Sequence, residues 1–333
     1  MTLHVELGEN GYDVVLEPGC LKRAGELLDL NRKVLVVTDS GVPKQYAETV
    51  AAACKRAVTV TVPEGEKSKS FPVLESLLSR MLSEGFTRGD CAVAVGGGVV
   101  GDLTGLAAAL YMRGIDFYNV PTTLLSQADS SIGGKTGIDL DGVKNIVGAF
   151  KQPKKVLIDP ETLSTLPPRQ IAAGSAEIIK AGLIADAELF SLYENGRNDD
   201  TVAVLSRALT VKKAVVEADE KEGELRRILN FGHTIGHGIE SVTGLYHGEC
   251  VALGMIPMCG PAVRERLRRV LVRIGLPTEV RADPDKVYAN LLHDKKAAGG
   301  KINAVFVDEP GNCKQISLSP DSLREQIGMV VKQ

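Results

Sequence analysis

Short runs of apolar residues recur through the first half of the chain, and they constrain its fold more than any other feature. The runs are KVLVVTD (33–39), AVTVTVP (57–63), CAVAVGGG (91–98), DFYNVPT (116–122) and KVLID (155–159). Helical patterns such as FPVLESLLSRMLSEG lie between them. Strands that alternate with helices in this way predict βαβ units and a doubly wound sheet. Before them, Leu3, Val5 and Leu7 alternate with polar residues, which predicts an antiparallel hairpin at the edge.

The pattern changes after Pro160. Helical periodicity dominates from there, over 169–196, 202–221, 225–243 and 247–275. The main strand signal in this half is INAVFVDEPG (302–311). A chain of 333 residues is long enough for two domains. We therefore expect an α/β, Rossmann-like N-terminal domain over 1–160 and a mainly α-helical C-terminal domain over 161–333.

Charge and cysteine content exclude several classes of function. The net charge of −3 gives no basic excess, which argues against nucleic-acid binding. The six cysteines form no CxxC pair, which favours reduced thiols over a disulfide framework. The opening sequence MTLHVELGENGYDVVLEPG lacks the apolar core of a signal peptide. No uncharged apolar run reaches the roughly 18 residues that span a bilayer. We expect a cytoplasmic protein that binds neither nucleic acid nor a membrane.

Three of the five histidines are grouped in a short stretch of the second half. His233 and His237 stand four residues apart in LNFGHTIGHGIE, which places them on one face of a helix. Asn230 and Arg226 extend the same stripe backwards at helical spacing. A solvated face is the alternative, but such faces are usually rich in Lys and Glu. The stripe therefore favours a reaction cleft, and His247 follows close by.

Histidines in this pattern are candidate zinc ligands, and a catalytic zinc ion takes about three protein ligands. Spacing alone favours His233 and His237 as the pair. The alternative pair is His233 with His247, which leaves His237 as an acid–base or anion-contacting group. Glu177 in AGSAEIIKAG is the best oxygen donor, with Lys180 one turn further on. Spacing does not decide between these pairs, or between a ligand role and an ordinary amphipathic-face role for Glu177.

A glycine-rich loop follows the strand-like run at 91–98. Gly96, Gly98 and Gly101 in GGGVVGD match the GxGxxG pattern and precede the helical sequence LTGLAAALYM. Such a loop lets the backbone approach a pyrophosphate at a helix N-terminus, although a tight turn is the alternative. Asp39 ends an earlier run, where it is placed like an acidic ribose contact or a helix cap. These features favour a dinucleotide site.

A segment rich in Gly, Ser and Thr runs from 112 to 151. Arg113, Lys135 and Lys144 are spaced through it, and Asp129 adds a carboxylate. Isolated cations in such surroundings suit phosphate or carboxylate recognition. Surface lysines beside turn glycines are the alternative. That alternative explains poorly why NVPTTLLSQADSSIGG contains no Lys, Arg or Glu, so we expect an anion site here.

Seven motifs in this order resemble those of the 3-dehydroquinate synthase family. They are GGGVVGD, YMRG, VPTTLLSQADSSIGGKTG, KNIVGAF, AEIIK, LRRILNFGHTIGH and HGE. The wider family is the sugar phosphate cyclases. The resemblance implies a dehydroquinate synthase/glycerol dehydrogenase-like fold, which is shared with metal-dependent alcohol dehydrogenases.

The same resemblance implies a set of site residues. A divalent metal, Zn²⁺ or Co²⁺, would be held by Glu177, His233 and His247. NAD would contact Asp39, Glu64, Gly65, Glu66, Lys67, Ser68, Lys69, Gly98, Val99, Val100, Gly101, Asp102, Thr122, Thr123, Lys135, Lys144, Thr162, Leu163, Ser164 and Thr165. The substrate would use Arg113, Asp129, Lys135, Asn145, Lys180, Lys212, Arg226, Asn230 and His237, with Lys295 or Lys296 from HDKK. By this resemblance His237 contacts the substrate phosphate, and Arg113 acts across a homodimer interface.

The activity that the resemblance implies is a lyase reaction of the shikimate pathway, in aromatic amino acid biosynthesis. The enzymes convert 3-deoxy-D-arabino-heptulosonate 7-phosphate to 3-dehydroquinate and phosphate. NAD transiently oxidises the sugar phosphate, phosphate is eliminated, the hydride returns, and an aldol closure forms the ring. The metal lowers the pKa of the hydroxyl that is oxidised, and cationic residues stabilise developing charge.

Some positions depart from the family pattern. Ala181 stands where a Tyr is usual, Val143 where a Gly is usual and Asp141 where a Pro is common, and the loop before His247 is shorter. These departures affect loops and leave the implied ligands and cations in place.

Two other activities are alternatives. Another sugar phosphate cyclase, such as 2-deoxy-scyllo-inosose synthase acting on glucose 6-phosphate, is the first. Lys212 and Arg226 favour a carboxylated substrate instead, and glucose 6-phosphate has no carboxylate. A simple polyol dehydrogenase is the second, and the predicted phosphate contacts argue against it.

Overall fold

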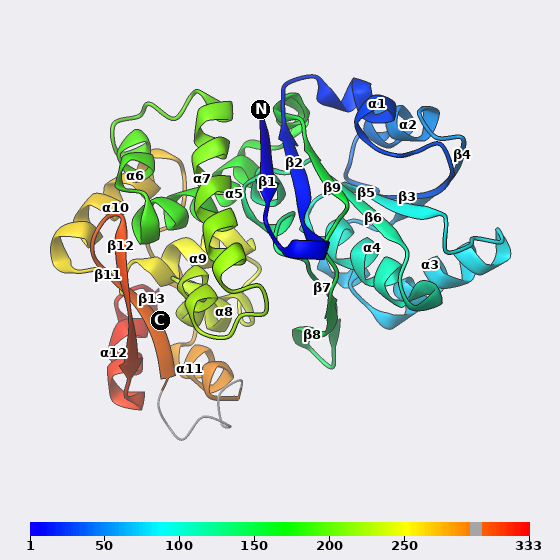
Figure 1. Cartoon of the computed structure of the whole chain (residues 1–333). Coiled ribbons are helices and arrows are strands. Elements are labelled where there is room, and N and C mark those ends of the chain that lie inside the picture. The colour runs from blue at the N-terminus through cyan, green and yellow to red at the C-terminus, as the bar shows by residue number, and fades with distance from the viewer. Residues whose placement is uncertain (294–301) are drawn as a thin grey trace. The chain divides into compact units, whose positions relative to one another are not determined.

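The computed structural model describes residues 1–293 and 302–333 and divides into two compact units, Met1–Leu166 and Pro167–Gln333 (Figure 1). The predicted boundary at residue 160 falls on the first residue of the 3-10 helix η6 (Pro160–Thr165). No helix within the described ranges combines the length and the apolar character needed to cross a bilayer.

Seven strands of the first unit form one sheet in the order β1-β2-β9-β6-β5-β3-β4. Every neighbouring pair is parallel except β1 and β2, which pair antiparallel at one edge. The predicted doubly wound sheet and its edge hairpin are confirmed. The strands are β1 (Thr2–Val5), β2 (Tyr12–Leu16), β3 (Lys33–Asp39), β4 (Arg56–Val62), β5 (Cys91–Gly96), β6 (Asp116–Pro121) and β9 (Lys155–Ile158).

Helices cover both faces of this sheet because alternate residues of a buried strand point to opposite sides. In β3, Leu35 packs in an apolar cluster with residues of α3 and α4. The next residue, Val36, packs in a second cluster with residues of α1 and α2. Both side chains are fully buried. The helices of this unit are α1 (Ala24–Leu27), α2 (Lys44–Ala52), α3 (Phe71–Ser83) and α4 (Gly98–Leu110).

The carboxyl ends of four parallel strands carry most of the loops that the sequence marks as functional. Strands β3, β4, β5 and β6 end at Asp39, Val62, Gly96 and Pro121. Open α/β sheets bind ligands at this edge. The candidate dinucleotide residues that follow these strands therefore lie at the same edge of the sheet.

A separate antiparallel hairpin interrupts the Gly/Ser-rich segment. It consists of β7 (Lys135–Leu140) and β8 (Val143–Phe150), two strands that the sequence pattern did not predict. Its two connecting residues, Asp141 and Gly142, have φ values of 51° and 80°. Positive φ at both central residues is what a type I′ hairpin turn requires, and Asp–Gly is a preferred pair for it. Asp141 therefore has a local structural role.

The second unit is mainly helical, as predicted, and the residues described in it also form two short strand pairs. Its helices are α5 (Pro168–Ala185), α6 (Ala187–Glu194), α7 (Thr201–Ala218), α8 (His233–Glu240), α9 (His247–Met255), α10 (Pro261–Arg273), α11 (Pro284–His293) and α12 (Pro320–Gly328). The strand pairs are β10 (Val280–Arg281) with β13 (Val331–Lys332), and β11 (Ile302–Glu309) with β12 (Asn312–Leu318). The predicted strand at 302–311 corresponds to β11.

The prediction of one helix over 225–243 is wrong. Leu225–Asn230 forms a 3-10 helix, η7, and α8 begins only at His233. Gly232 between them has φ 78°, in the left-handed region, which an α-helix cannot contain. The polar stripe from Arg226 to His237 therefore spans two helices. The predicted helix at 247–275 is likewise divided, because Pro261 starts the new helix α10.

Candidate active site

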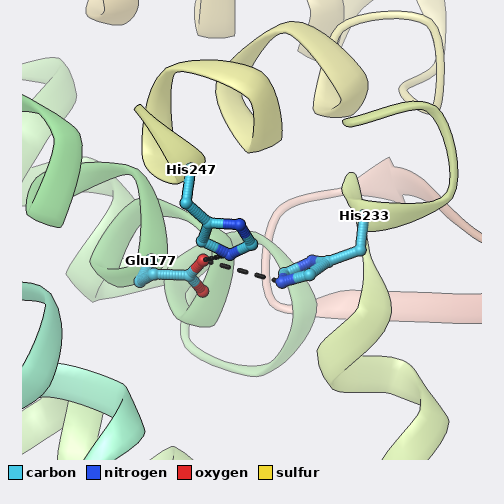
Figure 2. A group of neighbouring side chains, drawn as sticks. All are labelled: Glu177, His233 and His247. Carbon is cyan, nitrogen blue, oxygen red and sulfur yellow. Dashed lines mark ion pairs between the residues drawn. The ribbon is translucent and has the colours of Figure 1, made fainter. Parts of the chain in front are cut away.

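Glu177, His233 and His247 come together in the second unit from three different helices (Figure 2). Glu177 lies in the middle of α5, and the histidines are the first residues of α8 and α9. Glu177 Oε1 lies 3.7 Å from His233 Nε2 and 3.5 Å from His247 Nε2. The Glu177 side chain is 1% exposed. The three side chains form a compact group of one oxygen and two nitrogen donors.

Small residues allow these three helices to approach closely. A Cβ at Gly248, in the first turn of α9, would lie 1.9 Å from the main-chain oxygen of Ala173 in α5. A Cβ at Gly232, just before α8, would lie 2.6 Å from Met255 Cγ in α9. Because no larger residue fits at either position, Gly248 brings the beginning of α9 against α5, and Gly232 brings the beginning of α8 against α9. The spacing of the three donors depends on this packing.

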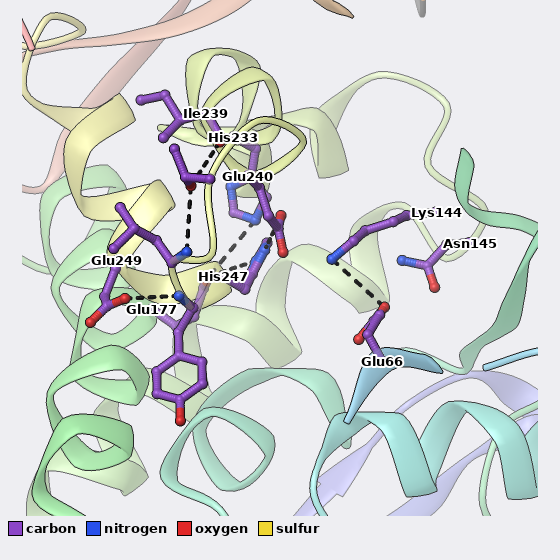
Figure 3. Close-up of polar contacts among 12 residues, drawn as sticks. Glu66, Lys144, Asn145, Glu177, His233, Ile239, Glu240, His247 and Glu249 are labelled. Carbon is purple, nitrogen blue, oxygen red and sulfur yellow. Dashed lines mark hydrogen bonds and ion pairs between the residues drawn. The ribbon is translucent and has the colours of Figure 1, made fainter. Parts of the chain in front are cut away.

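The start of α9 is anchored by charged contacts. Arg169 donates two hydrogen bonds to the Glu249 carboxylate, at 2.7 and 2.8 Å. Glu249 Oε2 also accepts from the Tyr246 main-chain N–H at 2.8 Å, which completes a capping box (Figure 3). The Arg169 guanidinium stacks over the Tyr246 ring, 4.4 Å from its centroid. These contacts fix the main chain on both sides of His247, which lies between Tyr246 and Glu249.

The second nitrogen of each histidine is also engaged. His233 Nδ1 lies 3.1 Å from the main-chain oxygen of Phe231, and His247 Nδ1 lies 3.1 Å from Glu240 Oε2. Both partners are acceptors, so Nδ1 carries the proton in each ring. When each ring is in its neutral form, the lone pair of Nε2 therefore points toward Glu177, which is the orientation that a metal ligand needs.

The charges of the group are strongly coupled. Burial alone would raise the pKa of Glu177, but Lys180 and the two imidazoles hold it well below its ordinary value. Burial and Lys180 lower the pKa of His233 to about 3. Burial also opposes a charge on His247, but Glu177 and Glu240 raise the pKa of His247 to about 10. Glu177 is thus ionised, with Lys180 and His247 as cationic neighbours, and His233 is neutral.

These residues fit a divalent metal ion. The ligand atoms of Glu177, His233 and His247 lie within 4.8 Å of one another. Two donors that share a tetrahedral zinc ion at about 2.1 Å lie roughly 3.4 Å apart. The separations of 3.5 and 3.7 Å from Glu177 Oε1 are close to that value. One buried carboxylate and two imidazoles are also the chemical set found in catalytic zinc sites.

His237 lies beside this group but belongs to a different one. Its ring centroid is 5.3 Å from that of His233 and 5.9 Å from that of His247. Its potential ligand atoms cluster with those of Glu240 and His247, and not with Glu177. His237 is exposed where His233 is partly buried. The geometry therefore favours His247 over His237 as the partner of His233 and Glu177.

Among the described residues of the same unit, three cations are buried. Lys180 pairs with Glu177, and the whole residues Lys180, Lys212 and Arg226 are 2%, 8% and 1% exposed. The Arg226 guanidinium donates to the main-chain oxygen of Glu220. Near it, Asn230 Nδ2 donates to Glu222 Oε1 at 3.3 Å. Lys295 and Lys296 lie outside the described residues.

Sequence reasoning missed Glu240. It lies seven residues after His233 and three after His237, so it shares their face of α8. That spacing was a usable signal. Glu222 was missed as well, and the charged run around it gave no sign of its contact with Asn230.

Charged residues also meet in the first unit, after β4 and around α4. Lys69 Nζ lies 2.8 Å from Asp102 Oδ2 and 3.4 Å from Glu66 Oε1, and it donates to Asn145 Oδ1. Lys144 Nζ lies 3.9 Å from Glu66 Oε1 (Figure 3). The Lys69 side chain is 4% exposed, and burial alone would lower its pKa, but Asp102 and Glu66 raise it. Predicted NAD contacts are thus brought together with Asn145.

The remaining predicted NAD residues follow strand ends. Gly98 to Asp102 form the first turn of α4, directly after β5. Asp39 accepts from the main-chain N–H groups of Gly41 at 2.8 Å and Val42 at 3.1 Å, so it also shapes its own turn. Glu64 to Lys69 follow β4, Thr122 and Thr123 follow β6, and Thr162 to Thr165 lie in η6.

The predicted anion contacts occupy the segment after β6. Lys135 lines a small cavity together with Asp102, Asn119, Ser130, Ser131 and Lys151. Asp129 lies in the π-helix Ser126–Ser130. Arg113 has φ 68°, a conformation that is uncommon outside glycine and marks a locally constrained turn. The first unit thus brings Lys135, but not every predicted cation, next to Asp102.

Comparisons with known proteins identify the family of this chain. The family model for the 3-dehydroquinate synthase N-terminal part matches residues 59–173, and that for the C-terminal part matches 174–297. The curated 3-dehydroquinate synthase of Caulobacter vibrioides (strain NA1000 / CB15N) is 45% identical, with 92% of each chain covered. That of Pelobacter propionicus (strain DSM 2379 / NBRC 103807 / OttBd1) is 41% identical, with 99% of each covered.

Solved structures are similar over nearly the whole chain. A 2-deoxy-scyllo-inosose synthase complexed with carbaglucose-6-phosphate, NAD⁺ and Co²⁺ has a TM-score of 0.89 at 26% identity, covering 98% of this chain and 99% of that one. The 2-epi-5-epi-valiolone synthase of Streptomyces hygroscopicus subsp. jinggangensis 5008, with NAD⁺ and Zn²⁺ bound, has a TM-score of 0.87 at 29% identity, covering 95% of each. A probable glycerol dehydrogenase from Sinorhizobium meliloti 1021 shares the fold, with a TM-score of 0.61 at 18% identity over 94% of each chain.

Fold and site together define an enzyme of the sugar phosphate cyclase class, built on the glycerol dehydrogenase-like fold. Within that class, the two matching family models and the curated relatives are specific. The chain belongs to the 3-dehydroquinate synthase family.

Proposed function

We propose that this chain converts 3-deoxy-D-arabino-heptulosonate 7-phosphate to 3-dehydroquinate and phosphate, using NAD and a divalent metal ion. The observation that carries the proposal is the meeting of Glu177, His233 and His247 in a unit that also buries three cations. Lys and Arg side chains recognise carboxylate and phosphate groups by charge-assisted hydrogen bonds. Cations gathered in the unit that holds the metal group therefore suit a substrate with a carboxylate and a phosphate.

The metal ion is assigned to Glu177, His233 and His247. When bound, the metal lowers the pKa of a coordinated substrate hydroxyl, and NAD accepts and returns a hydride. Lys180, in contact with Glu177, balances the charge of the carboxylate. The Nδ1 contacts of the two histidines fix which nitrogen faces the reacting group.

Recognition of the substrate is assigned to the cationic residues. Lys212 and Arg226, buried in the second unit, suit the carboxylate, since an arginine fork matches carboxylate geometry. His237, which is exposed beside the metal group, is assigned to the phosphate with Arg113, Lys135 and Asn145. Asp129, Lys180 and Asn230 complete the predicted substrate contacts. These groups hold the sugar phosphate and stabilise the charge on the departing phosphate.

NAD is assigned to the strand ends of the first unit. Lys69, Asp102 and Glu66 form a preorganised charged cluster there, and α4 offers its N-terminal N–H groups at Gly98. Asp39 at the end of β3 is placed to contact a ribose. All six cysteines are thiols, which agrees with a cytoplasmic enzyme.

A homodimer with Arg113 acting in the neighbouring subunit's site completes the proposal. Mixing tests this arrangement. Subunits with Arg113→Ala and subunits with His233→Ala are each expected to be inactive, and mixed dimers are expected to regain activity. In such a dimer, one site receives both an intact metal group and an intact Arg113. No recovery in verified mixed dimers would contradict the arrangement.

Phosphate release tests the activity itself. The protein is incubated with the heptulosonate phosphate, catalytic NAD and Zn²⁺ or Co²⁺. We expect phosphate in many-fold excess over NAD, with no net rise in absorbance at 340 nm. Turnover of glucose 6-phosphate in place of the heptulosonate would instead indicate a 2-deoxy-scyllo-inosose synthase. Steady NADH production from an alcohol would indicate a polyol dehydrogenase.

A further inference from the structure

Glu240 is an acidic residue beside the metal group that the proposed reaction does not use. It is the last residue of α8, and its side chain is 10% exposed. Its Oε2 lies 3.1 Å from His247 Nδ1 (Figure 3). The first residue of the same helix is His233. One helix therefore carries a proposed ligand at its start and a carboxylate partner of the other histidine at its end.

The two histidines have different partners on their far sides. His233 Nδ1 faces a neutral main-chain oxygen, that of Phe231, and His247 Nδ1 faces the carboxylate of Glu240. A carboxylate accepts the Nδ1 proton more strongly than a carbonyl does, and it makes the opposite nitrogen a better electron donor. It also fixes the rotation of the ring, because Nε2 then has to point away from Glu240.

From this arrangement, we infer that Glu240 is a positioning residue that orients His247 and strengthens it as a metal ligand. The inference rests on the proposed assignment of the metal to Glu177, His233 and His247. Glu240 acts through His247 and has no direct contact with the ion.

The alternative is that Glu240 is itself a ligand, because its oxygens also cluster with donor atoms of His237 and His247. Two features argue against it. The separation of 3.1 Å between Oε2 and His247 Nδ1 is that of a direct hydrogen bond. Ligand atoms that share an ion lie farther apart, at roughly 3.4 Å. His237, the third member of that group, is exposed.

Metal binding to the apoprotein tests the inference without using activity. Wild-type protein, Glu240→Gln and Glu240→Ala are titrated with Co²⁺ while the visible absorption of the bound ion is followed. Loss of a carboxylate partner typically weakens metal binding about 10- to 100-fold. We expect a loss of that size for Glu240→Ala and a smaller one for Glu240→Gln, whose amide oxygen still accepts from Nδ1. The Co²⁺ spectrum is expected to shift, and the stoichiometry is expected to stay at one.

Glu265→Ala is the matched control, because Glu265 is an exposed acidic residue of α10 in the same unit. Its Co²⁺ affinity is expected to equal that of the wild type, and the thermal midpoints of all the apoproteins show whether the fold is intact. An unchanged dissociation constant for Glu240→Ala would overturn the inference, as would two bound ions in the wild type and one in the variant. If the wild type binds no Co²⁺, or if Glu177→Ala binds it normally, the proposed metal site itself fails.

Discussion

At the scale of single residues, the metal group depends on which nitrogen of each histidine faces Glu177. His233 and His237 are one helical turn apart and look equivalent in the sequence. The structure separates them, because only His233 brings a nitrogen to within 3.7 Å of Glu177. His237 belongs with Glu240 and His247 instead. The two histidines are thus equivalent in spacing but have different proposed roles.

Substitution of these two histidines is expected to have different results. His233→Ala removes one of about three ligands, and we expect Co²⁺ affinity to fall at least 100-fold with loss of activity. His237→Ala is expected to keep Co²⁺ affinity within about threefold and to raise the KM for the sugar phosphate at least tenfold, because it removes a charge-assisted phosphate contact. Equilibrium dialysis and steady-state kinetics measure the two effects. Equal loss of metal in both variants would contradict the division.

At the scale of elements, the strands were predictable and the breaks between helices were not. The apolar runs that predicted β3 to β6 are short and bounded, so their period and length were sufficient. The helix over 225–243 failed, since the spacing of Arg226 to His237 is helical although Gly232 turns the chain between them. No local sequence pattern predicts the positive φ of Gly232. Nor could spacing join Glu177 to His233, because their contact depends on the packing of α5 and of α8 against α9.

Gly232 offers a direct test of that packing. Its φ of 78° disfavours any side chain, and a Cβ would lie 2.7 Å from the Val251 main-chain oxygen. We expect Gly232→Ala to lower the free energy of unfolding by about 2 to 4 kcal/mol and to weaken Co²⁺ binding. Gly244→Ala is the control, because nothing lies within 4 Å of its added Cβ and its φ is not positive. Urea unfolding measures both variants. Equal stability of the two would show that the close approach is not required.

The start of α6 makes a pH-dependent contribution to stability. Asp186 caps this helix by accepting from Leu189 N–H, and it pairs with Arg207. Burial alone would raise the pKa of Asp186, but Arg207 and the cap hydrogen bond hold it below its ordinary value. A lowered folded-state pKa adds stability that is fully present above the unfolded pKa of about 3.9 and is lost as the pH falls through the folded value.

Asp186→Asn keeps a capping oxygen and removes the charge. We therefore expect it to be less stable than the wild type by about 0.5 to 1 kcal/mol at pH 7, and we expect that difference to disappear toward pH 2. Urea unfolding of both proteins across that range measures it. A difference that stays constant with pH would show that the ion pair with Arg207 contributes nothing.

At the scale of the whole molecule, the two units have different proposed tasks. The charged cluster around Lys69 and the first turn of α4 lie in Met1–Leu166. The metal group lies in Pro167–Gln333. Motif content allowed each task to be predicted from its own half of the sequence, because each group of contacts is made by residues of one unit. Glu240 was not among the predicted residues. Its proposed role depends on the ring orientation of His247, which sequence spacing does not define.

This separation predicts that NAD and metal binding can be lost independently. Removal of the metal with a chelator, or Glu177→Ala, is expected to change the NAD dissociation constant less than about threefold, because all the assigned NAD residues lie in the first unit. Asp102→Asn removes the charge that pairs with buried Lys69. It is expected to weaken NAD binding at least tenfold and to leave Co²⁺ affinity unchanged, since Lys69 loses the nearer of its two carboxylate partners and the buried charged cluster is no longer held in place. Calorimetric titration of each protein with NAD and with Co²⁺ measures the four constants. Loss of Co²⁺ binding in Asp102→Asn, with the apoprotein still folded, would mean that the two sites are coupled and that the division of tasks is incorrect.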